Sequence, residues 1–161
     1  MRRSLRLALV VAALAAVPLW YFFRPERAVL DRTTAEPAPG GVVRVLAAGT
    51  FEPRGHTGRG RAEVLLLADG ERVLRLSEFA TLDGPDLQVY LIGRTAVAGR
   101  EGLDRAGFVP LGALKGNRGD QNYALPPDVD LARYPAVAIW CRRFAVNFTD
   151  ASLDSAAAAG L

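Results

Sequence analysis

Residues 61–76, RAEVLLLADGERVLRL, decide the fold. Two runs rich in branched apolar residues flank Asp69-Gly70, a pair that favours the central positions of a tight hairpin turn. Arg61–Ala68 and Glu71–Leu76 are therefore predicted to form a β-hairpin.

Further runs of strand character lie on both sides of this hairpin. Val42–Ala47 precedes it, and Leu87–Ile92, Ala136–Cys141 and Ala145–Phe148 follow it. Ala136–Cys141 is apolar on both faces, which is typical of a central strand. Glycines and prolines recur too often between these runs for long helices. We therefore predict an all-β domain over residues 42–153, a mostly antiparallel β-sandwich or barrel.

A basic and then apolar N-terminus precedes this domain. Residues 1–6 contain three arginines and are predicted to be a cytoplasmic stub, while 7–23 are uninterrupted by charge. As a helix, 7–23 would be roughly 25 Å long, within the usual range for a membrane span. The aromatic residues Trp20–Phe23 stand where a cleavage site would need small residues. We predict an uncleaved, single-pass transmembrane signal anchor in contact with membrane lipid, with the domain on the periplasmic or extracellular side.

The remaining segments are predicted to lack packed structure. Residues 24–41 are rich in Pro, Gly and Thr and indicate a flexible tether, and 154–161 form an Ala-rich tail. The formal net charge of +3 is accounted for by residues 1–36, which hold six arginines and three acidic residues. A neutral domain without a basic stripe predicts no nucleic-acid partner. Gly112–Gly116 lacks the spacing of a phosphate-binding loop, so no nucleotide is expected.

Cys141 is the single cysteine, so no intramolecular disulfide can form. The thiol is then a buried hydrophobic group, a ligand, a reactive group or an intermolecular partner. The period of two places Cys141 with Val137 and Ile139 on one face and Trp140 on the other. That face favours an inert, buried cysteine. The position at the strand end, beside Arg142 and the arginine after it, favours a partly exposed thiolate.

Four strings in the domain stand out as a set: Gly49-Thr50-Phe51 followed by His56, Gly84-Pro85-Asp86-Leu87, Leu114-Lys115-Gly116-Asn117, and Ile139-Trp140-Cys141. In this order they resemble the DM-thirteen domain, a β-rich family described as an electron-transfer module. The resemblance covers roughly residues 46–153. It implies a redox or electron-transfer role with Cys141 as the redox thiol, and it places a family histidine at His56.

The resemblance also implies a cofactor and a partner. Haem or a soft metal is the implied cofactor, with Cys141 and His56 as candidate ligands. Relatives of the family often carry haem-binding or cytochrome modules beside this domain, and this sequence contains neither. The electron donor or acceptor is therefore expected to be a redox or envelope protein acting in trans.

Taken without the resemblance, the same residues have structural interpretations. Asp86 and Asp120 are expected to stabilise turns, and Tyr123 and Trp140 to pack in the core or against loops. His56 lies in a polar, glycine-rich loop, where a solvated histidine is as good an interpretation as a ligand. Two hypotheses follow: a redox module centred on Cys141, or a non-catalytic β-sandwich for binding or scaffolding in the cell envelope. An accessible thiol favours the first, and full burial among aliphatic side chains favours the second.

Overall fold

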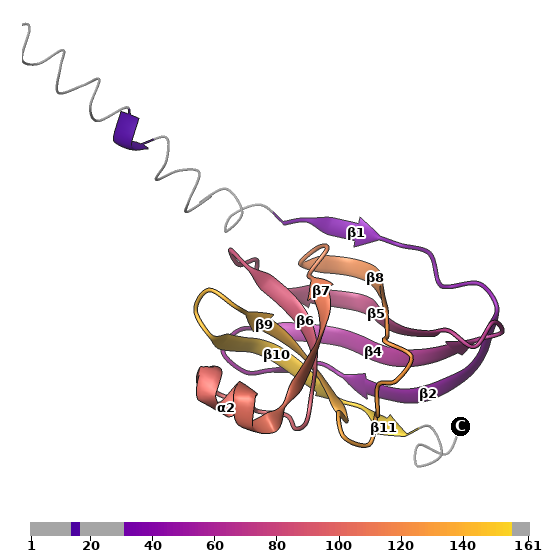
Figure 1. The fold of residues 1–161 in the computed structure, drawn as a ribbon. Helices are drawn as coiled ribbons and strands as arrows, with labels where there is room; N and C mark the ends of the chain where they lie inside the picture. Colours follow the sequence, from indigo (N-terminus) through magenta and orange to yellow (C-terminus); the bar gives the residue numbers. More distant parts are fainter. Residues whose placement is uncertain (1–13, 17–30, 156–161) are drawn as a thin grey trace, which may run out of the picture.

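The computed structural model describes residues 14–16 and 31–155, and the chain forms two β-sheets there (Figure 1). One sheet has the strand order β1-β8-β5-β4-β2-β11, and the other has the order β3-β10-β9-β6-β7. The elements are β1 (Thr33–Ala35), β2 (Val42–Thr50), β3 (Glu52–Pro53), β4 (Gly58–Leu67), β5 (Arg72–Thr81), β6 (Leu87–Ile92), α2 (Gly99–Ala106), β7 (Phe108–Ala113), β8 (Arg118–Ala124), β9 (Ala136–Cys141), β10 (Val146–Ser152) and β11 (Asp154–Ser155).

The predicted hairpin is confirmed as the antiparallel pair β4 and β5. Val64 lies opposite Leu74, and the turn closes through a hydrogen bond from the Leu67 amide to the Glu71 carbonyl. Gly70 has a φ of 87°, which a glycine adopts without steric cost. The two strands extend well beyond the predicted runs because neighbouring strands on both sides continue the hydrogen-bonded ladder.

Strand β9 is central in its sheet, with β10 on one side and β6 on the other, and both pairings are antiparallel. All six of its residues are buried. Val137, Ile139 and Cys141 belong to the core between the two sheets, whereas Trp140 belongs to a second cluster on the opposite face. The predicted division of the strand into two faces is therefore confirmed.

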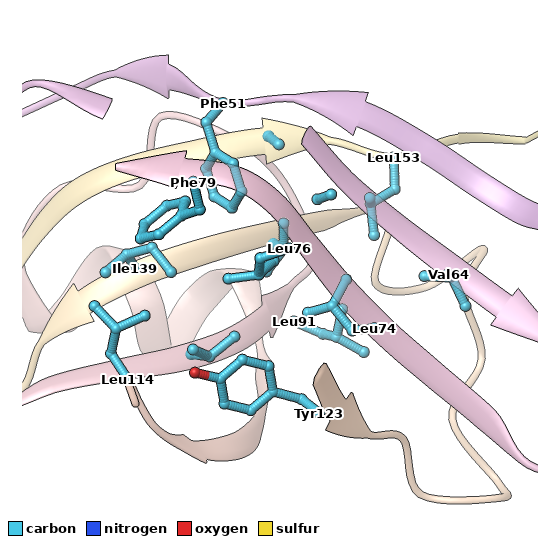
Figure 2. Close-up of a cluster of buried hydrophobic side chains, with 14 of the residues drawn as sticks. Phe51, Val64, Leu74, Leu76, Phe79, Leu91, Leu114, Tyr123, Ile139 and Leu153 are labelled. Atoms are coloured by element: carbon cyan, nitrogen blue, oxygen red, sulfur yellow. The ribbon is translucent and has the colours of Figure 1, made fainter. Parts of the chain in front are cut away.

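The two sheets pack face to face, so the domain is a mostly antiparallel sandwich and the prediction of an all-β domain is confirmed. Val64 of β4 and Leu74 of β5 belong to one buried cluster with Leu91 and Ile139 of the opposite sheet, and Leu74 lies beside Leu91 (Figure 2). The outer face of the five-stranded sheet is covered by α2, whose Leu103 is fully buried in the cluster that contains Trp140. Burial of these apolar side chains is the main stabilising contribution to such a fold.

The sequence did not predict β8, because RGDQNYA is polar and typical of a loop. Its place is decided by tertiary pairing, antiparallel to β5 and parallel to β1. The structure also differs from the predicted tether and tail. Thr33–Ala35 pair with the edge of β8, and Asp154–Ser155 pair with β2.

The predicted anchor, 7–23, lies outside the described residues except for Leu14–Ala16, and the basic stub 1–6 lies outside them entirely. Within residues 14–16 and 31–155, no helix has the length and the apolar character needed to cross a membrane.

Candidate functional site

Cys141 is the last residue of β9 and lies between two neighbouring strands. It is opposite Leu87 of β6 and Val146 of β10, and its exposed fraction is 0%. The free thiol belongs to the same apolar cluster as Val137 and Ile139. In this position the thiol has no contact with solvent.

Arg142, which follows Cys141, forms an ion pair with the carboxylate of Asp86. Arg142 Nε donates to Asp86 Oδ2 at 2.9 Å, and the Arg142 amide donates to the Asp86 carbonyl at 3.0 Å. The hydrogen bond to Asp86, reinforced by its charge, raises the pKa of Arg142. Asp86 also accepts a hydrogen bond from Gln88 Nε2, so it fixes the start of β6 through side chains and an ion pair. The expected role was to stabilise a turn, but the Asp86 carboxylate instead bonds to the side chains of Gln88 and Arg142 and so joins the start of β6 to the end of β9.

His56 lies over the ring of Phe148, with the two ring centroids 4.0 Å apart. Its backbone amide donates to the Phe148 carbonyl at 3.1 Å, which holds the loop after β3 against β10. Across the described residues, no hydrogen bond joins His56 to Cys141.

Ligands for haem iron or a soft metal do not converge at these two residues. Within residues 14–16 and 31–155, no group of three His, Cys, Asp or Glu side chains is arranged to hold a metal ion. Soft metals are usually held by several thiolate and imidazole ligands that meet at one point. Cys141 is enclosed by aliphatic groups and His56 packs on an aromatic ring, so the residues present do not fit such a group.

The string Leu114–Asn117 and the residues that follow it, up to Tyr123, form a closed network of hydrogen bonds. Gln121 is fully buried, and its amide accepts from the Gly116 N–H and donates to the Gly116 carbonyl. The Tyr123 hydroxyl donates to Gln121 Oε1 at 2.8 Å and accepts from the Lys115 amide at 3.1 Å. Burial raises the pKa of Tyr123 to about 12. Each of these groups is satisfied, so the string has a structural role.

The same string holds the N-terminal strand β1. Asn117 Nδ2 donates to Asp31 Oδ1, and Asn117 Oδ1 accepts from the Arg32 amide. A side chain at Gly119 would collide with the Thr34 backbone, so only glycine allows β1 to approach this closely. The glycines and amides of the string therefore recognise an extended segment of the chain itself.

Asp120 lies within strand β8 and not in the predicted turn, and its side chain bonds to the neighbouring strand β5. Its Oδ1 accepts from the Glu78 amide at 2.9 Å, and its Oδ2 accepts from Arg75 at 2.6 Å. Glu78 has a φ of 51°, and this bond compensates part of the strain of that conformation.

A second polar cluster is formed by Arg54, in the loop after β3, and by Asn147 and Asp150 of β10. Asp150 is fully buried, and its Oδ1 accepts from Arg54 Nε at 2.9 Å. Its Oδ2 accepts from Asn147 Nδ2 at 2.8 Å and from the Ala96 amide at 2.7 Å. A buried carboxylate is tolerated only with such partners. We refer to these three side chains as the Asp150 cluster.

The family model described as electron transfer DM13 matches residues 50–153 of this sequence. The chain belongs to this DM13 family. All four strings that stood out in the sequence lie in or at the edge of the matched region, and the domain they mark is the β-sandwich. No curated protein and no solved structure matches the chain.

Sequence reasoning missed the Asp150 cluster of this DM13 domain. Its signal was an aspartate, Asp150, inside a run that otherwise has the character of a buried strand, Val146–Ala151. The partner, Arg54, is distant in sequence and comes from the loop after β3, so only the fold joins the two.

Proposed function

We propose that this DM13 protein is an electron-transfer module that residues 7–23 anchor in a membrane, with the domain on the periplasmic or extracellular side. Membership of the electron-transfer family carries the first part of the proposal. The basic stub and the long apolar run support the second part. A redox or envelope protein acting in trans supplies or takes the electrons.

We assign the redox role to Cys141, the only thiol of the chain. Because its side chain is fully buried, the thiol cannot meet a reagent or another protein while β9 is closed. Reaction at Sγ then requires the end of β9 and the turn at residues 142–145 to open. Local opening at a strand end costs less free energy than global unfolding, so such access is physically reasonable.

A second candidate function is a non-catalytic binding or scaffolding module of the cell envelope, with Cys141 as a core residue. The observation that favours it is the complete burial of Cys141 beside Val137 and Ile139. The absence of converging ligands at Cys141 and His56, among the residues that the structure describes, points the same way.

Thiol labelling of the full-length protein in detergent separates the two candidates. If Cys141 is the redox group, a small thiol reagent reacts much faster than the domain unfolds. The free thiol is the reduced form, so it gives electrons to an oxidant: attack of Sγ on a small disulfide forms a mixed disulfide at Cys141 and releases one thiolate. Cys141→Ser and Cys141→Ala are both expected to abolish this electron exchange, with the fold intact in Cys141→Ala. Labelling only at the rate of global unfolding, with electron exchange unchanged in both variants, would assign the binding role instead.

The membrane topology has its own test. A reporter that fluoresces only in the cytoplasm, fused after Leu161, is expected to stay dark, and the full-length protein is expected to remain with membranes after alkaline washing. A fluorescent fusion, or release of a soluble form that begins after Ala16, would contradict the anchor.

A further inference from the structure

The N-terminal strand enters the sandwich at one end, which the strand register identifies. Thr33 of β1 lies opposite Arg118 at the start of β8, and Ala80, near the end of β5, lies opposite the same arginine. The connection from β5 to β6 reaches the turn between β9 and β10, because the Arg142 amide donates to the Asp86 carbonyl. We call this end the proximal end (Figure 1). It consists of residues 31–32, 57–59, 81–86, 117–118 and 142–145.

The docking of β1 shortens the free connection between the proposed anchor and the domain. Asp31 is held at the proximal end, where its carboxylate accepts hydrogen bonds from Asn117 and Arg118. Phe23, the last residue of the proposed anchor, precedes Asp31 by eight residues, so a fully extended chain separates the two by at most about 29 Å. Strand β5 alone extends over about 33 Å. An anchored domain is therefore tied to the membrane by its proximal end.

Two large apolar side chains are exposed at the proximal end. Leu82, in the connection from β5 to β6, is 51% exposed, and Phe144, in the turn between β9 and β10, is 62% exposed. Single apolar residues are ordinary on protein surfaces, but these two lie on separate connections at the end nearest to the anchor. Both would leave water if this end met the boundary between lipid headgroups and acyl chains.

The two ends of the sandwich also differ in charge. The proximal end holds five arginines and three aspartates, a net charge of +2. The opposite end, here called the distal end, consists of residues 41–43, 68–72, 93–94 and 124–135. It holds three arginines and four acidic residues, a net charge of −1. Anionic lipid headgroups therefore attract the proximal end in preference to the distal end.

A hollow of about 160 Å³ brings a cation and an apolar side chain together at the proximal end. It is lined by Thr57–Arg59, Ala80–Leu82 and Arg118. Arg59 is exposed and forms no ion pair with any residue that the structure describes. Its guanidinium is therefore available to a phosphate group, which arginine binds through paired hydrogen bonds.

We propose that the proximal end lies against the membrane surface. Leu82 and Phe144 enter the boundary between headgroups and acyl chains, and Arg59 binds the phosphate of an anionic phospholipid. Apolar side chains flanked by arginines suit this boundary, because the arginine stem follows apolar surface while its charged head stays among the phosphates. The inference rests on the anchor of the proposed function and does not involve the redox role of Cys141.

The test places the deuterated, ¹⁵N-labelled full-length protein in nanodiscs of phosphatidylcholine and phosphatidylglycerol. A nitroxide on the headgroup of a minor lipid broadens the NMR signals of amides that lie near the membrane surface. We expect loss of the Asp83 and Ala145 amide signals and persistence of the Gly70 signal at the distal end. In nanodiscs of phosphatidylcholine alone the loss is expected to be smaller, because the anionic headgroups are missing.

A pair of double variants separates a surface contact from the effect of the short connection. Leu82→Ser with Phe144→Ser is expected to restore the two lost signals. Val42→Ser with Val43→Ser removes two exposed apolar side chains from the distal end and is expected to leave the signals lost. Unchanged loss in the first double variant would mean that the connection alone positions the domain, and would overturn the proposal.

The arginine contact has its own pair of variants. Arg59→Gln is expected to restore the lost signals in part, whereas Arg44→Gln, which removes another exposed arginine outside the proximal end, is expected to have no effect. Equal behaviour of the two variants would overturn the phosphate contact. Equal loss at both ends of the domain, or loss of the Gly70 signal alone, would overturn the proposed orientation and leave the anchor standing. Elution of the protein apart from the nanodiscs would contradict the anchor and the orientation together.

Discussion

The hydrogen bonds that join Gln121, Gly116, Tyr123 and Lys115, here called the Gln121 network, differ from the Asp150 cluster in how completely they pair their buried polar atoms. Each places amides and charged groups within a β-sandwich, where unpaired polar atoms are costly. In the first, both ends of the Gln121 amide and the Tyr123 hydroxyl are satisfied by neighbouring residues. In the second, the carboxylate is satisfied but Asn147 Oδ1 is not.

The difference shows that prominence in the sequence does not identify the region where a polar atom stays unpaired. The Gln121 network includes Lys115 and Gly116 of one string that carries the family resemblance, and its residues are all paired. No local pattern predicts the Asp150 cluster, and it contains the unpaired Asn147 Oδ1. Two other buried atoms without a partner, Arg32 Nε and Asp83 Oδ2, belong to one ion pair. One is a donor and the other an acceptor, so a small rotation within the pair can join them.

The largest effect is expected from Asp150→Ala. This change leaves the guanidinium of Arg54, the amide of Asn147 and the Ala96 N–H without their acceptor. Breaking a buried pair in this way costs about 3–5 kcal/mol in the free energy of unfolding. Chemical denaturation of the full-length protein in detergent measures it. Asp104→Ala, which removes an exposed ion pair with Arg100, is the matched control and is expected to cost about 0.5 kcal/mol or less.

Comparison of Gln121→Ala with Asn147→Ala tests the difference between the two regions directly. Gln121→Ala leaves the backbone groups of Gly116 and the Tyr123 hydroxyl without these hydrogen-bond partners. We expect this change to lower the free energy of unfolding by roughly 2–4 kcal/mol. Asn147→Ala removes one hydrogen bond and an oxygen that was already unpaired, so about 1 kcal/mol is expected. Equal costs in denaturation experiments would mean that the comparison is wrong.

Gly119→Ala is expected to release β1 from the edge of β8. Gly119 has a φ of 93°, and a methyl group there meets the Thr34 backbone. Backbone strain alone costs about 1–3 kcal/mol. Gly70→Ala is the matched control, because Gly70 has a φ of 87° and open space around it. The Glu36 amide, just after β1, donates to the Asp120 carbonyl of β8 at 3.0 Å and reports on this pairing. Its hydrogen exchange is expected to be faster in Gly119→Ala and unchanged in Gly70→Ala.

The smallest expected effect is a weaker pairing of β1 with β8 at acid pH. The hydrogen bond from Lys115 lowers the pKa of Glu36, and the hydrogen bonds from Asn117 and Arg118 lower the pKa of Asp31. Groups with a lowered folded pKa stabilise the fold above their unfolded pKa, about 4 for both, and lose this contribution as the pH falls through the folded value. Protection of the Glu36 amide against hydrogen exchange should therefore decrease below about pH 4. Protection that is constant down to acid denaturation would rule out a contribution from these pairs.

The sequence alone predicts an all-β, mostly antiparallel domain and the two faces of its central strand, and leaves the choice between sandwich and barrel to the structure. Asp69-Gly70 between two apolar runs specifies a hairpin through local turn geometry alone. The alternation along Ala136–Cys141 then assigns Cys141 to the core side and Trp140 to the other side, as found. Both inferences need only neighbours in the chain, which is why they succeeded.

Only the tertiary structure decided the place of β8, the docking of β1 and the Asp150 cluster. A polar strand such as RGDQNYA is stabilised by the strands beside it, and no local pattern records them. Arg54, in the loop after β3, and Asp150, in β10, are 96 residues apart, so the low-polarity environment that pairs their charges exists only after the sheets have packed. The free acceptor at Asn147 follows from that pairing, because the buried carboxylate fixes which end of the amide remains open.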